Sequence, residues 1–79
     1  MYFMKDEPDR VRAVAPQHVG YWSSLAVTRY LGGPFADRSG GLITFETESD
    51  EKAERLVSDD PFLRQGLLSS HWLKEWAIS

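Results

Sequence analysis

The order of strand-like and helix-like segments constrains the fold of this chain more than any other feature. Stretches with the two-residue period of strands alternate with stretches that have the period of helices. The expected strand, helix, strand, strand, helix and strand are residues 1–4, 16–28, 29–35, 42–47, 50–60 and 67–78. This order predicts an α+β fold of the ferredoxin-like type, β-α-β-β-α-β, with two helices on one face of an antiparallel sheet. The 79 residues leave room for one domain, residues 1–79.

Local signals place the ends of the helices. The charged segment 5–12 contains Pro8 and is expected to be a loop, whereas Pro16 suits the first turn of a helix. At 100° per residue, four side chains of this helix fall within a sector roughly 100° wide. They are His18, Tyr21, Trp22 and Leu25. Ser49 is expected to cap the second helix, and Pro61 to end it.

The sheet is expected to have apolar side chains on both faces. In the last strand, Trp72, Trp76 and Ile78 alternate with Leu67, Leu73 and Ala77. Because the helices cover only one face, the other must meet water or a partner, and a large bare apolar face usually marks an interface. The chain has no cysteine for disulfides, so oligomerisation is the expected source of extra stability. We infer a two-fold homodimer, with a higher assembly of dimers left open.

Composition excludes several classes of partner and cofactor. The net charge is −3 and the nine basic residues are scattered, which argues against nucleic acid. No apolar run is long enough for a membrane span and no signal peptide is visible, so a cytoplasmic location is expected. With no cysteine and two histidines, no metal ligand is assigned: a histidine-rich zinc site is not expected, and a site built from carboxylates stays open. The two Gly-Gly pairs lack the context of a phosphate loop, and no cofactor is predicted.

Short motifs along the chain resemble those of one family. Residues 15–19 (APQHV) are similar to a Pro-x-His-Leu motif that opens the first helix, and residues 32–37 (GGPFAD) to a Gly-Pro segment that ends the second strand. Residues 39–43 (SGGLI) resemble the start of the third strand. Residues 59–62 (DDPF), followed by 65–67 (QGL), resemble an Asp-Pro-Phe…Gly-Leu segment after the second helix. Together these motifs resemble the YciI-like, or YCII-related, family.

The resemblance implies a dimeric α-β barrel and a His–Asp pair. The family's histidine maps to His18 and its aspartate to Asp37. One relative eliminates chloride from a hydroxyquinone-like compound, which implies isomerase or lyase chemistry as a candidate here. The chain departs from the family pattern between Ser24 and Tyr30, where an Asp/Glu-Gly turn is missing.

His18 and Asp37 are therefore the candidate catalytic residues. Histidine exchanges a proton near neutral pH, and a carboxylate at one ring nitrogen would fix its tautomer and leave the other nitrogen as a base. The alternative is a core histidine bonded to backbone and an ordinary turn aspartate. The leading hypothesis is a cofactor-independent isomerase or lyase acting on a small polar metabolite, an aromatic-derived one among the candidates. The other is a non-catalytic dimeric module that binds a small ligand or a partner.

Gly33, Pro34 and Phe35 are the candidate substrate-binding residues. Glycines inside a strand indicate either a bulge or the close approach of a ligand, and both interpretations stay open. The tryptophans are expected in the core and the dimer interface rather than on a substrate. His71 has no assigned role.

Overall fold

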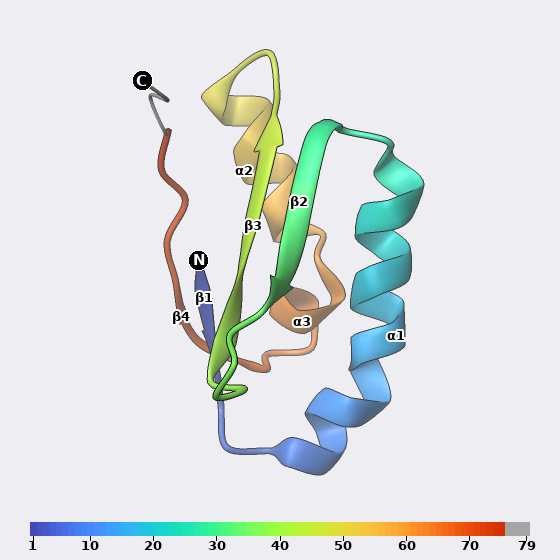
Figure 1. Cartoon of the computed structure of the whole chain (residues 1–79), viewed down its shortest axis with the longest axis vertical. Helices are drawn as coiled ribbons and strands as arrows, with labels where there is room; N and C mark the ends of the chain where they lie inside the picture. Colours follow the sequence, from blue (N-terminus) through green and yellow to red (C-terminus); the bar gives the residue numbers. More distant parts are fainter. Residues whose placement is uncertain (76–79) are drawn as a thin grey trace.

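A four-stranded antiparallel sheet carries its helices on one face (Figure 1). The computed structural model describes residues 1–75. In chain order the elements are β1 (Tyr2–Met4), α1 (Pro8–Leu25), β2 (Thr28–Pro34), β3 (Gly40–Glu46), α2 (Asp50–Ser58), α3 (Pro61–Arg64) and β4 (Leu68–His71). The strand order is β2-β3-β1-β4. This order confirms the predicted α+β fold of the ferredoxin-like type.

The two faces of the sheet differ in what packs against them. Tyr2 of β1 packs against the rings of His18 in α1 and Phe62 in α3, with centroids 5.7 and 6.2 Å apart. Phe3, the next residue, must point the opposite way because side chains alternate along a strand. We call the side that Tyr2 occupies the helix-facing side and the side that Phe3 occupies the open face. In Figure 1, α2 and α3 lie behind the strands and α1 runs along the β2 side.

The core lies between the helices and the helix-facing side of the sheet. Its buried apolar side chains come from α1, α2, α3 and the residue before β4, and they are Trp22, Ala53, Phe62 and Leu67. Leu67 is fully enclosed, and its backbone is bonded on both sides, to Lys5 and to Phe62. As predicted, Ser49 caps α2, and its side chain accepts from the backbone of Lys52 at 3.2 Å.

The first helix begins eight residues earlier than predicted. Of the predicted loop 5–12, only residues 5–7 lie outside helix and strand, because α1 starts at Pro8, and Pro16 lies inside it. Pro8 suits the first helical position as well as Pro16 does, since its missing N–H would have no partner there. A distant contact then holds the first turns: Arg10 donates to the backbone oxygen of Gln65 at 2.9 Å. The helix ends at Leu25, short of the expected Thr28.

The strands also differ from their predicted bounds. β3 starts at Gly40, two residues earlier than expected. β4 ends at His71 because β1, the strand it pairs with, is three residues long. The predicted strand at 76–78 lies outside the described residues. The irregularity in β2 falls between Thr28 and Leu31, where Arg29 has a φ of 54°, and not at the glycines.

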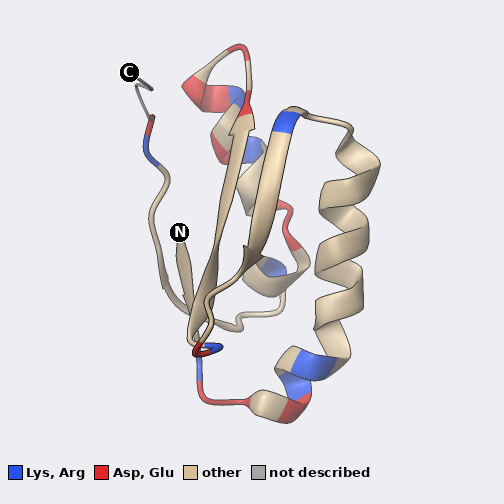
Figure 2. Cartoon of the chain, in the orientation of Figure 1, with Lys and Arg blue, Asp and Glu red and all other residues tan. Residues whose placement is uncertain are grey.

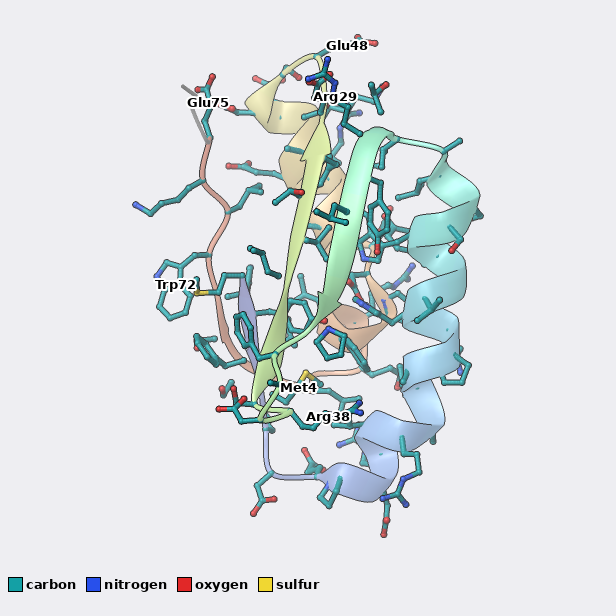
Figure 3. The ribbon with its side chains drawn as sticks, in the orientation of Figure 1. Met4, Arg29, Arg38, Glu48, Trp72 and Glu75 are labelled. Atoms are coloured by element: carbon teal, nitrogen blue, oxygen red, sulfur yellow. The ribbon has the colours of Figure 1, made fainter. Side chains whose placement is uncertain are left out.

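The open face is apolar and uncovered. Leu31, Leu42 and Trp72 are 73, 45 and 50% exposed. Trp72 packs edge-on against Phe3, and Figure 3 shows its side chain on the side of β4 away from α1. Helices α2 and α3 and the connection between them carry Lys, Arg, Asp and Glu, whereas the middle of the strands carries none (Figure 2).

Candidate functional site

His18 lies on the side of α1 that packs against the sheet. Its residue surface is 7% exposed, and Trp22, one helical turn later, is 2% exposed. Residues four apart share one face of a helix, so the apolar sector expected from the sequence buries both. The imidazole stacks on Phe62 with ring centroids 4.3 Å apart and lies beside Tyr2. It is thus enclosed between α1, α3 and β1.

The carboxylate bonded to His18 is Asp60, in the connection between α2 and α3. His18 Nδ1 lies 2.9 Å from Asp60 Oδ1 and 2.8 Å from Oδ2. Trp22 Nε1 donates to Oδ2 at 2.7 Å, and the backbone N–H of Phe62 donates to Oδ1 at 2.8 Å. The last bond makes Asp60 the N-cap of α3. Three donors from two helices therefore converge on one buried carboxylate.

This contact fixes which nitrogen of His18 carries the proton. An ionised carboxylate only accepts hydrogen bonds, so Nδ1 is the donor and Nε2 of the neutral ring keeps its lone pair. Within residues 1–75, no hydrogen bond involves Nε2, and no fully buried side-chain nitrogen or oxygen lacks a partner. Nε2 is therefore in contact with solvent-accessible space. An imidazole with one nitrogen held by a carboxylate and the other free is arranged to take up or release a proton.

Asp37, the predicted partner of His18, lies elsewhere. It sits in the exposed turn between β2 and β3, where its Oδ1 accepts from the backbone N–H of Ser39 at 3.0 Å and from the Ser39 hydroxyl at 2.7 Å. These bonds lower the pKa of the Asp37 carboxyl because they favour its charged form. The structure thus pairs His18 with Asp60, while Asp37 stabilises its own turn.

The three predicted substrate-binding residues are divided between the two faces of the sheet. Pro34 pairs with Gly41 on the helix-facing side, the side that His18 occupies. Gly33 pairs with Leu42 on the open face. Phe35 packs against Phe3, with ring centroids 5.7 Å apart, also on the open face. Pro34 alone of the three shares a side with His18.

A cavity of about 50 Å³ lies between the sheet and the helices, and of the pair it is Asp60, not His18, that lines it. Its walls are mostly apolar and include Trp22, Ile43, Phe45, Phe62 and Leu68. Its titratable side chains are Tyr2, Asp60 and His71. Such a cavity has room for a few ordered waters or a small group of a ligand.

Tyr2 is the titratable group of the site whose acidity the fold changes most clearly. Burial raises the pKa of the Tyr2 hydroxyl to about 12, and the negative charge of Asp60 and the neighbouring Tyr30 act in the same direction. Tyr2 is therefore a neutral hydroxyl, able to donate a hydrogen bond, throughout the neutral pH range.

This shift predicts an alkaline loss of stability that depends on Tyr2. An unfolded tyrosine loses its proton near pH 10, whereas folded Tyr2 keeps it to about pH 12. The folded chain binds more protons in this window, so the free energy of unfolding must fall as the pH rises through it. Urea titrations at pH 9 and 11.5 should show a smaller fall for Tyr2→Phe than for wild type. Equal falls for the two proteins would contradict the assignment.

Neither a metal-binding group of side chains nor a membrane-spanning helix is found in the part of the chain that the structure describes. Across residues 1–75, no three His, Cys, Asp or Glu side chains are grouped so that they could hold a metal ion. Over the same residues, no helix combines the length and the apolarity needed to cross a membrane.

Comparison with known families gives one match. The model of the YCII-related domain matches residues 1–77. The chain belongs to the YCII-related family. Comparison with curated proteins and with solved structures found no significant match. The YCII-related region includes both His18 and Asp60, so the whole buried pair lies within the family domain.

One signal in the sequence of this YCII-related protein pointed to Asp60. An aspartate directly before a proline is typical of an N-cap followed by the first helical position, and Asp60-Pro61 has this form. The motif was visible as part of the family resemblance, but nothing local to it indicated that the carboxylate would also reach α1. That contact spans 42 residues of sequence.

Proposed function

We propose that this YCII-related protein is a small enzyme that moves a proton on a small polar metabolite. His18 is the general acid and base, and Asp60 orients it. The observation that carries the proposal is the buried bond from Nδ1 to Asp60, which leaves Nε2 in contact with solvent-accessible space. A carboxylate in this position holds the ring in one orientation and stabilises the positive charge that forms when Nε2 takes a proton.

The proposed reaction is of the isomerase or lyase type and uses no cofactor. Nε2 removes a proton from carbon, and the same proton returns to another atom, or a leaving group departs from the neighbouring carbon. The apolar walls of the cavity favour a substrate with a flat or compact carbon skeleton, such as an aromatic-derived metabolite. Polar groups of the substrate would meet Tyr2 and His71 at the same cavity.

The test is the exchange of carbon-bound hydrogen with solvent. Panels of small carbonyl compounds, lactones and quinone-derived acids would be incubated with the protein in D₂O and followed by proton NMR. We expect wild type to exchange or convert at least one compound, and His18→Gln to lower that rate about 10²- to 10⁴-fold, the usual contribution of a general base. Circular dichroism confirms that the variant is folded. Conversion at the wild-type rate by His18→Gln would remove His18 from the mechanism.

The same assay decides between the two carboxylates. If Asp60 orients His18, Asp60→Asn lowers the rate. Asp37→Asn should leave it near wild type, because among the described residues the Asp37 carboxylate accepts hydrogen bonds only from Ser39. The reverse result would return the role of partner to Asp37. Tight binding of a compound with no exchange by any variant would favour the alternative function, a binding module.

We also propose that the protein acts as a homodimer formed through the open face. Leu31, Leu42 and Trp72 expose apolar surface there, and the middle of the strands carries no Lys, Arg, Asp or Glu (Figure 2). A chain of this size has a thin core, and covering this face with a second copy would add to it. The dimer would leave the cavity beside His18 on the opposite side of each sheet.

A further inference from the structure

Two glycines on the helix-facing side of the sheet are each covered by a tyrosine hydroxyl. A Cβ on Gly32 would lie 2.7 Å from the hydroxyl oxygen of Tyr30. A Cβ on Gly41 would lie 2.6 Å from Cζ of Tyr2 and would also collide with its hydroxyl oxygen. Each hydroxyl therefore occupies the space that a side chain would otherwise fill.

The register of the sheet brings these two positions together. Gly32 pairs with Ile43, and Pro34 pairs with Gly41. Gly32 and Gly41 are thus diagonal neighbours on adjacent strands and on the same side of the sheet. The Tyr30 hydroxyl lies close enough to Tyr2 to contribute to the raised pKa of Tyr2.

Neither hydroxyl has a partner among residues 1–75, and both lie close enough to Asp60, the partner of His18, for its charge to raise their pKa. The Tyr2 ring is 5.7 Å from the imidazole, and the Tyr30 ring stacks on Trp22 at 6.0 Å. Tyr21, by contrast, donates its hydroxyl to the backbone oxygen of Leu56. Tyr2 is partly buried and Tyr30 is 39% exposed, and a hydroxyl without a protein partner is a donor available to a ligand.

We propose that the hydroxyls of Tyr2 and Tyr30 bind the oxygen of a carbonyl substrate on which His18 acts. This proposal rests on the proposed function, in which His18 moves a proton on the substrate. When Nε2 takes a proton from the carbon beside the carbonyl, the C–H electron pair forms a C=C bond and the carbonyl oxygen becomes an oxyanion. Two neutral donors placed at that oxygen stabilise its developing charge.

The charge of the site favours a carbonyl oxygen over a phosphate group. No lysine or arginine is among the described residues that line the cavity, which include Tyr2 and Asp60. The Asp60 carboxylate nearby would oppose the two negative charges of a phosphate group more strongly than the single charge of a carbonyl-derived oxyanion. Burial and Asp60 also raise the pKa of Tyr30, so both donors keep their protons at neutral pH.

Acetate, a planar oxyanion, tests this site without requiring turnover. It would be titrated at pH 7 while the NMR signals of the His18 ring are followed. We expect saturable binding to wild type, and an increase of about tenfold in the dissociation constant for Tyr2→Phe and for Tyr30→Phe, since each loses one hydrogen bond to a charged group. Tyr21→Phe is the matched control and should bind acetate as wild type does.

A second variant moves a hydroxyl instead of removing it. Gly32→Ala places a methyl group against Tyr30, a flexible side chain that has to shift, and should weaken acetate binding by a similar factor. No saturable binding to wild type, or equal binding by wild type, Tyr2→Phe and Tyr30→Phe, would overturn the proposal. Tyrosine-dependent binding supports it even if no compound exchanges hydrogen, a result that would count against the proposed enzyme alone.

Discussion

Replacing Asp60 by alanine is expected to lower the free energy of unfolding by about 3–5 kcal/mol. Asp60 is 7% exposed and accepts from His18, Trp22 and the backbone of Phe62. Alanine would leave all three donors buried without an acceptor, and each unsatisfied group costs about 1–3 kcal/mol. A domain of this size has a total stability of about 5–10 kcal/mol, so the loss would be a large fraction of that stability.

The neighbouring aspartate supplies the matched control. Asp59 is exposed, and its carboxylate lies 3.9 Å from the guanidinium of Arg64, a surface pair worth less than about 1 kcal/mol. Urea unfolding followed by tryptophan fluorescence should show Asp59→Ala close to wild type and Asp60→Ala at a much lower midpoint. Equal midpoints for the two variants would show that the buried network does not stabilise the fold.

The element order was predictable from the sequence because it depends on periodicity, which is local. The start of α1 was not, since Pro8 and Pro16 both suit a first turn and the choice depends on the contact of Arg10 with Gln65. The end of β4 likewise depends on the length of β1, its neighbour in the sheet.

The candidate site, too, was predictable only in part. His18 was predictable because its place in the apolar sector of α1 is a local property. Its partner was not, because the bond to Asp60 forms only when α1 packs against α3. Which glycine of β2 faces the helices, Gly32 or Gly33, also depends on the register of the strand. The irregularity near Arg29 helps set that register. A shift of one residue exchanges the two faces, which explains why Gly32, and not Gly33, adjoins the site.

Placing a charge on the open face should convert the proposed dimer into a monomer. Leu42 is 45% exposed in the single chain and lies in β3, the strand between β2 and β1. In a two-fold dimer through this face, Leu42→Lys would bury two unpaired charges, one from each copy. We expect the dissociation constant of the dimer to rise about 100-fold or more. Light scattering at micromolar concentration should report a mass near 18 kDa for wild type, twice the chain mass of 9.0 kDa, and near 9 kDa for the variant.

Val19→Lys is the matched control for Leu42→Lys. Val19 is 60% exposed on α1, away from the open face, so its substitution should leave the dimer intact. A monomeric wild type would show that the open face is not covered by a second copy. A dimer broken by Val19→Lys but not by Leu42→Lys would move the interface to the outer surface of α1. Because the cavity lies on the other side of the sheet, Leu42→Lys should still bind acetate at the tyrosine pair, which separates the role of the open face from that of the site.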